Sequence, residues 1–106
     1  MAFSQPFAHN VMDILLRIDG VTSKKMFGGL GIMLNGKMFA LIKDSELYFK
    51  TDDRNRKRFT DAGMTAFLAS EKKKGMPYFE VPPYVVSDTE ALLDWVQSSL
   101  EIASEK

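Results

Sequence analysis

The dipeptide Asn35-Gly36 constrains the fold of this chain more than any other feature. Both central residues of a type I′ turn need a positive φ, which Asn and Gly adopt most easily, so the pair signals a tight β-hairpin. Apolar residues alternate on both sides of it, and a further β-rich run, Leu47-Tyr48-Phe49-Lys50, follows a break at residues 43–46. We therefore predict three short strands within residues 26–50, around which the rest of the chain is organised.

The composition is that of an ordinary globular protein and excludes several kinds of chemistry. The chain has 106 residues, of which 45% are apolar and 26% charged, which suits one domain spanning residues 1–106. Its formal net charge is zero, so no overall field draws it to nucleic acid or to an anionic membrane. The absence of cysteine excludes disulfides, thiolate catalysis and cysteine-based zinc sites.

The sequence shows no membrane or secretion signal. No apolar run approaches the ~20 residues that a bilayer-spanning helix needs. The first ten residues lack a basic stretch followed by an apolar core, so they do not resemble a secretory signal. We expect a cytoplasmic protein with no membrane partner.

Helical patterns open and close the chain. Ser4 can cap a first helix with Pro6 in its first turn, and Asp19-Gly20 ends it. Ser87 or Asp88 can cap a last helix. One face of this last helix carries Leu92, Trp95, Val96, Ser99 and Ala103. We predict that both helices bury an apolar face in the core.

The remaining segments complete an α+β pattern. Residues 21–25 read as a short connector, and residues 52–63 as a helix. Residues 64–70 and 76–81 read as two further strands, joined by a charged connection at residues 71–75. The predicted element order is α-β-β-β-α-β-β-α.

The glycine-dense stretch at residues 26–31 superficially resembles a nucleotide-binding loop. Such a loop joins a strand to a helix, so that the helix N–H groups face the phosphate. Here Gly31 leads directly into the predicted hairpin. We therefore expect a β-bulge or a close approach of another backbone at this point.

The predicted helix at residues 52–63 is strongly basic. Asp52 is a suitable N-cap, and Gly63 ends the segment. Between them stand Arg54, Arg56, Lys57 and Arg58, with Phe59 as the one large apolar residue. Two interpretations stay open: a solvated edge whose cations face acidic neighbours, favoured here, or a surface that tracks phosphates together with Lys24, Lys25 and residues 72–74.

No constellation of residues indicates an active site. His9, the single histidine, has no sequence partner for a metal site or a catalytic triad. Asp52 and Asp53 are adjacent, so on a helix their side chains point apart. We expect no catalytic residue, no cofactor and no metal, and hence no enzyme.

Several blocks together resemble the N-terminal domain of the TfoX (Sxy) family of bacterial competence regulators. They span essentially the whole chain, from the glycine-dense stretch to the last helix. Their most distinctive residues are Met26, Phe27, Gly28, Gly29, Gly31, Gly36, Pro77, Tyr78, Phe79 and Trp95. We interpret these residues as structural, because glycines permit special backbone geometry and the aromatic residues can fill the core.

The resemblance implies both a fold and a role. The implied fold is a two-layer α/β sandwich with a five-stranded antiparallel sheet, similar to type III secretion chaperones and likewise prone to dimerise. Full-length members of the family work with the cyclic-AMP receptor protein at promoters of DNA-uptake genes. They carry a second, C-terminal domain, and we expect this chain to end where that domain would begin.

Three functional hypotheses follow. The leading one is a non-enzymatic protein-interaction module, a homodimer with a protein partner such as the transcription machinery, in the control of competence or a related process. The alternative is a direct nucleic-acid binder that uses the local basic patch around residues 54–58. The third is a small-ligand pocket under the glycine-dense stretch.

Overall fold

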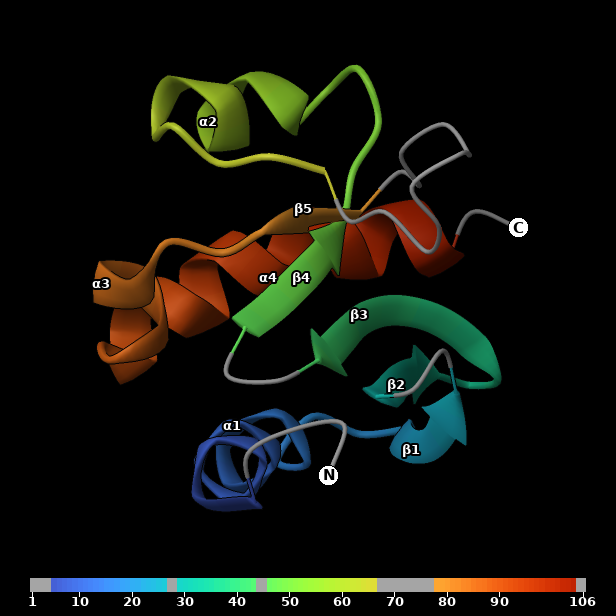
Figure 1. The fold of residues 1–106 in the computed structure, drawn as a ribbon. Coiled ribbons are helices and arrows are strands. Elements are labelled where there is room, and N and C mark those ends of the chain that lie inside the picture. The colour runs from blue at the N-terminus through green and yellow to red at the C-terminus, as the bar shows by residue number, and fades with distance from the viewer. Residues whose placement is uncertain (1–4, 27–28, 44–45, 67–77, 105–106) are drawn as a thin grey trace.

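The computed structural model describes residues 5–26, 29–43, 46–66 and 78–104. Within them the chain forms a mixed α+β fold with a five-stranded antiparallel sheet in the order β1-β2-β3-β4-β5 (Figure 1). The elements are α1 (Gln5–Leu15), β1 (Val21–Met26), β2 (Gly29–Leu34), β3 (Lys37–Lys43), β4 (Glu46–Lys50), α2 (Arg56–Asp61), β5 (Tyr78–Glu80), α3 (Pro83–Val86) and α4 (Thr89–Ser104). The predicted α+β class is confirmed.

The predicted hairpin joins β2 to β3. Asn35 and Gly36 have φ values of 51° and 86°, as a type I′ turn requires. A register shift between Ile32 and Met33 marks a bulge in the pairing of the two strands. A Cβ added at Gly29 would collide with the carbonyl oxygen of Ile42, so the backbone of β3 approaches β2 closely there. The close approach expected for the glycine-dense stretch is therefore met at Gly29, whereas the bulge lies just beyond the stretch, at Ile32 and Met33.

One prediction was wrong: residues 21–25 are not a connector but belong to β1, an edge strand. Val21 pairs with Leu34 and Met26 with Gly29, so the strand is defined by its ladder to β2. The side chains of residues 22–25 are all exposed. Such a strand shows no apolar alternation, and edge strands commonly carry lysine on their exposed face.

The chain beyond β4 also differs from the predicted element order. Within the described part, residues 64–66 contribute only an isolated bridge, between Ala66 and Phe79, and residues 67–70 of the predicted strand lie outside it. The last strand is β5, and residues 71–77 also lie outside the described part. A short helix that the sequence did not predict, α3, begins at Pro83, where proline supplies a φ already suited to a first helical turn.

The main core lies between one face of the sheet and the helices. Val11 and Leu15 of α1 and Leu92 and Val96 of α4 are buried there against Phe49 and its neighbours in the sheet. Asp88 caps α4, because its Oδ1 accepts hydrogen bonds from the N–H groups of Glu90 and Ala91, at 3.1 and 3.3 Å. The predicted burial of one face of this helix is therefore confirmed.

The opposite face of the sheet carries a smaller buried cluster. It contains Leu41, Tyr48 and Tyr78, with Met38 packed against them. The hydroxyl of Tyr78 donates a hydrogen bond of 3.2 Å to the carbonyl oxygen of Met38, and burial raises the pKa of this hydroxyl. No helix in the described part is long and apolar enough to span a bilayer.

Candidate interaction surfaces

The basic segment, which we define as residues 52–61, is a turn followed by a short helix. The predicted helix start at Asp52 was wrong, because α2 begins at Arg56 with Asn55 in the N-cap position. Asp52 instead closes a turn: its Oδ1 accepts a hydrogen bond of 2.8 Å from the N–H of Arg54, and its carbonyl oxygen accepts one from the N–H of Arg56. Asp side chains favour such turns over helix positions.

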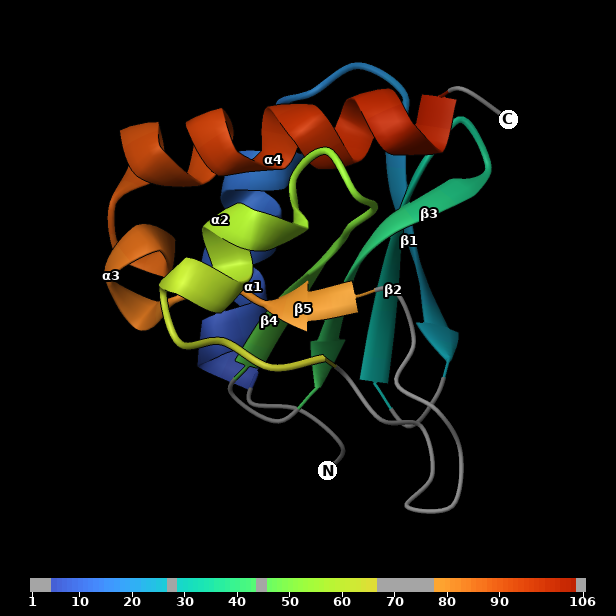
Figure 2. The same cartoon turned by 90° about the horizontal axis from the view of Figure 1, so that it is seen from above.

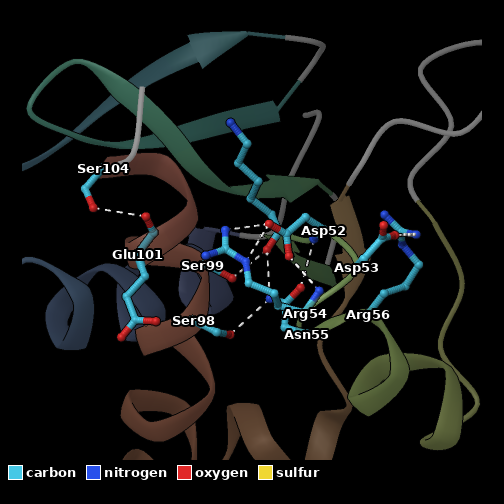
Figure 3. A network of polar contacts seen from close by, with 10 residues as sticks. Asp52, Asp53, Arg54, Asn55, Arg56, Ser98, Ser99, Glu101 and Ser104 are labelled. Carbon is cyan, nitrogen blue, oxygen red and sulfur yellow. Dashed lines mark hydrogen bonds and ion pairs between the residues drawn. The ribbon is translucent and has the colours of Figure 1, made fainter.

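All four cations of the basic segment pair with carboxylates of this chain. The bridges are Arg54–Asp52 at 2.6 Å, Arg56–Asp53 at 2.9 Å, Lys57–Asp61 at 2.7 Å and Arg58–Asp94 at 2.6 Å. Figure 3 shows the first two. Hydrogen bonding by Arg54 lowers the pKa of Asp52, and the hydrogen bond to Asp61 raises the pKa of Lys57. The four positive charges are thus matched by four negative ones at short range.

Aromatic packing attaches the basic segment to α4. Phe59 is fully buried, and its ring meets that of Trp95 edge to face with the centroids 5.1 Å apart. The guanidinium carbon of Arg58 lies 4.3 Å from the centroid of a Trp95 ring, while the same guanidinium bonds to Asp94. Arg58 is therefore held from two sides by α4.

A polar cluster makes the second attachment (Figure 3). Asn55 is buried, and its Oδ1 accepts a hydrogen bond of 2.9 Å from the N–H of Asp52. Its Nδ2 donates to the carbonyl oxygen of Lys50 at 3.3 Å and to the hydroxyl of Ser98 at 3.0 Å. The hydroxyl of Ser99 donates to the same Lys50 carbonyl at 2.8 Å. The end of β4, the turn before α2, and α4 are thus tied together.

The other candidate cations do not join the basic segment. Lys24 and Lys25 are exposed on β1, the first strand of the sheet, whereas α2 contacts β5, the last strand (Figure 1). As neighbours in a strand, the two lysines also point to opposite faces of the sheet. Residues 72–74 lie outside the described part. The structure therefore separates the described candidates into two groups at opposite edges of the sheet.

A cleft of about 550 Å³ lies elsewhere, between α1 and α3. Figures 1 and 2 both place these helices at the end of the molecule away from β1. We call it the α1–α3 cleft. Its lining includes Ile14, Leu47, Val81 and Val86 among its apolar residues, and none of the glycine-dense stretch. The hypothesis of a pocket under that stretch thus finds no counterpart in this cleft.

The α1–α3 cleft has an acidic lining. Asp13, Glu46 and Glu80 contribute to it, and its one basic lining residue is Arg17, which pairs with Asp13 at 3.4 Å. Burial, and then the charge of Glu46, raises the pKa of Glu80. Among the described residues, neither Glu46 nor Glu80 forms an ion pair. No group of three or more His, Cys, Asp or Glu residues in the described ranges could hold a metal ion.

Sequence reasoning did not find the α1–α3 cleft. Asp13 and Arg17 are four residues apart on or just after α1, which signals only a local helix pair. Glu46 starts β4 and Glu80 ends β5, and 33 residues of sequence separate them. No spacing rule connects these positions, because it is strand pairing that brings them together, with Tyr48 opposite Glu80.

The residues that carry the family resemblance fall mainly in the sheet and in α4. Gly29 and Gly31 lie in β2, Gly36 in the hairpin turn, and the backbone of Met26 in β1. Tyr78 and Trp95 are buried, and Phe79 packs against the main core. Phe27, Gly28 and Pro77 lie outside the described residues.

Comparison with known proteins identifies a family for this chain. No curated protein matches this chain. The model of the TfoX N-terminal domain family matches residues 13–103, from α1 to the last turn of α4. This match covers most of the chain and includes every strand of the sheet. The chain therefore belongs to the TfoX N-terminal domain family.

Proposed function

We propose that this protein is a non-enzymatic interaction domain that acts as a homodimer in the transcriptional control of DNA uptake or a related process. The family membership supports this role, since TfoX N-terminal domains are not a known enzyme family. The observation that carries the proposal is the pairing of all four cations of the basic segment with the chain's own carboxylates. Phosphate binding would have to compete with those carboxylates.

The outer edge of β1 supports self-association. Among the described residues, β1 pairs only with β2, so the backbone N–H and C=O groups on its other side face no strand. An edge of this kind can accept another strand, and its six residues match the usual length of a pairing strand. Lys24 and Lys25 would select against random partners at this edge.

The first experiment is the solution mass by light scattering at low and high salt. We expect a dimer at both, because backbone pairing and apolar contacts do not depend on long-range charge. A monomer at both salts would contradict the homodimer. In the organism that encodes the chain, deletion of its gene should change the transcript levels of DNA-uptake genes, and unchanged transcripts would contradict the regulatory role.

A DNA titration separates the proposal from the nucleic-acid alternative. We expect fluorescence anisotropy to detect no binding whose affinity falls steeply with salt. A steep slope that the double variant Arg54→Ala/Arg58→Ala flattens would instead favour a phosphate-binding surface. The variant Lys24→Ala/Lys25→Ala serves as the matched control, because it removes two cations from the opposite edge of the sheet.

A further inference from the structure

The backbone of β1 presents hydrogen-bonding groups along its outer edge at every second residue. The N–H of Asn35 donates a hydrogen bond of 2.9 Å to the carbonyl oxygen of Gly20, in the same register that pairs β1 with β2. Hydrogen-bonded pairs recur at every second position of an antiparallel ladder, so residues 22, 24 and 26 bond to β2. The N–H and C=O groups of residues 21, 23 and 25 therefore point away from β2.

Most of these outward groups meet no partner within the described part of the chain. The N–H of Val21 donates a hydrogen bond of 3.3 Å to the carbonyl oxygen of Ile18, whereas Ser23 and Lys25 form no such bond to any described segment. The side chains of residues 22–25 are exposed. The edge therefore has both the free backbone groups and the access that an added strand needs.

The opposite edge of the sheet is not open in this way. β5 has only three residues, and the N–H of Glu80 donates a hydrogen bond of 3.0 Å to the carbonyl oxygen of Thr65 on the side away from β4. Ala66 forms a bridge with Phe79 on the same side. A strand added to this sheet would therefore pair with β1.

The sequence of β1 is complementary to itself when two copies run antiparallel about Ser23. A two-fold axis through Ser23 pairs Val21 with Lys25 of the second copy, and both have outward-facing backbone groups. It also pairs Thr22 with Lys24, so that each lysine faces an uncharged residue. An axis at Lys24 or Lys25 would set lysine directly opposite lysine, which is destabilising. An axis at Val21 or Thr22 would leave Lys25 beyond the end of the second strand.

We propose that two copies of this chain pair β1 with β1, antiparallel and centred on Ser23, and so join their five-stranded sheets into one. The inference rests on the proposed function, because it names the interface and the register of the proposed homodimer. Each Ser23 exchanges backbone hydrogen bonds with its counterpart, and each Lys25 N–H donates to the Val21 carbonyl oxygen of the second copy. The same patch serves both copies, as it does in most symmetric dimers.

This pairing also decides how the two copies face. Paired residues of antiparallel strands point to the same face of a sheet, so α1 and α4 of both copies cover one face of the joined sheet. The two clusters that contain Leu41, Tyr48 and Tyr78 lie on the other face. Lys24 is on that face as well, because it stands opposite Gly31, which stands opposite Leu41.

Single-cysteine variants test the register, because the native chain has no cysteine. In Ser23→Cys the two thiols meet across the axis, where the Cα atoms of a hydrogen-bonded pair are ~5.5 Å apart and a disulfide can form. Thr22→Cys and Lys25→Cys are the matched controls, because their thiols are diagonal or more distant neighbours, at least ~7 Å apart. The measurement is the fraction of disulfide-linked dimer on a non-reducing gel after incubation with oxidised glutathione.

We expect at least tenfold more linked dimer for Ser23→Cys than for either control. A smaller excess, no linked dimer, or the strongest cross-link at Thr22→Cys or Lys25→Cys would overturn the proposal.

Ser23→Pro tests the backbone bonds of the interface. The N–H of Ser23 points away from β2, so proline removes a bond of the proposed dimer and none of the ladder within one copy. Ser23→Ala keeps the N–H and is the matched control. We expect the dissociation constant of the dimer, measured by sedimentation, to rise at least tenfold in Ser23→Pro and to stay within about twofold in Ser23→Ala. A folded Ser23→Pro that dimerises as tightly as Ser23→Ala would overturn the proposal.

Two measurements keep the outcomes distinct. Circular dichroism shows whether Ser23→Pro folds, and if it does not, the cross-linking of Ser23→Cys decides the proposal. Light scattering on the native protein separates this inference from the proposed function. A native dimer without the Ser23→Cys cross-link refutes the β1 interface alone, whereas a native monomer refutes both the interface and the homodimer.

Discussion

The basic segment and the α1–α3 cleft differ in how their charged side chains are paired. In the basic segment each of four cations meets a carboxylate of the same chain within 3 Å, and two of the pairs form within a stretch of three or four residues. In the cleft, Glu46 and Glu80 come from different strands, and neither forms an ion pair among the described residues, although Lys43 stands opposite Glu46 in the β3–β4 ladder. A run of charged residues in a sequence is therefore a weaker guide to a binding surface than charged side chains that form no ion pair in the described structure.

Phe59→Ala is expected to have the largest effect, because the burial of Phe59 in the core holds the basic segment in place. Phe59 is fully buried against Trp95 and lies 6.3 Å from Phe79, centroid to centroid. Removing such a ring costs about 3–5 kcal/mol of unfolding free energy, from lost burial and the cavity left behind. Urea unfolding followed by tryptophan fluorescence measures the loss.

Tyr84→Ala is the control for this prediction, since its ring is exposed and its loss should change stability by about 0.5 kcal/mol or less. A loss below about 1 kcal/mol for Phe59→Ala would show that the segment is not anchored in the core.

Asn55→Ala tests the polar attachment and should have the next largest effect. The substitution removes hydrogen bonds to Asp52, Lys50 and Ser98 and leaves buried polar groups without their partner. We expect a cost of about 1–3 kcal/mol, again by urea unfolding. Ser98→Ala removes one of these bonds and should cost less. If the two variants were equally destabilising, the bonds to the backbone would contribute nothing.

Arg58→Ala tests whether the cations of the segment serve the fold rather than a ligand. The variant loses the bridge to Asp94 and the contact with the Trp95 ring, which together should cost about 1 kcal/mol. Because salt screens the bridge but not the ring contact, the difference from the native protein should shrink in 1 M salt without vanishing. An unchanged free energy of unfolding would show that Arg58 does not stabilise the fold, and would favour the hypothesis that it binds nucleic acid.

Glu80→Gln tests the charge of the cleft and should have the smallest effect. A carboxyl whose pKa is raised in the folded state binds more protons when folded, so its ionisation lowers stability as the pH rises through that pKa. At pH 7 the neutral variant should therefore be more stable, by about 0.5 kcal/mol given the exposure of the site. Below the ordinary glutamate pKa the two proteins should unfold alike.

Thermal unfolding of Glu80→Gln and the native protein between pH 3 and pH 8 measures this difference. Glu90→Gln, an exposed position in the first turn of α4, is a suitable control, because it lies near the positive end of the helix dipole and should lose stability slightly instead. A variant Glu80→Gln that is less stable at pH 7 would mean that a cation of this chain does neutralise the cleft.

Local chemistry was enough to predict the hairpin, to narrow the cap of α4 to Ser87 or Asp88, and to predict the buried face of this helix. The type I′ turn depends only on the φ values open to Asn35 and Gly36, and the α4 cap on Asp88 and two nearby N–H groups. The buried face of α4 is visible in the sequence because its buried residues recur every three or four positions along the helix. Each of these signals involves residues a few positions apart, so the sequence displays it directly, and the family match rests on the same elements.

Only the tertiary structure decided that residues 21–26 form a strand and that α2 begins at Arg56. It also decided that Glu46 and Glu80 both line the α1–α3 cleft. β1 exists through its ladder to β2, and α2 begins after a turn that Asn55 ties to Ser98, 43 positions away. The α1–α3 cleft is lined by residues of α1, β4, β5, α3 and α4, so Glu46 and Glu80 share it only once these elements are packed together. Pairing between distant segments leaves no periodic trace in sequence, whereas turns, caps and amphipathic faces do.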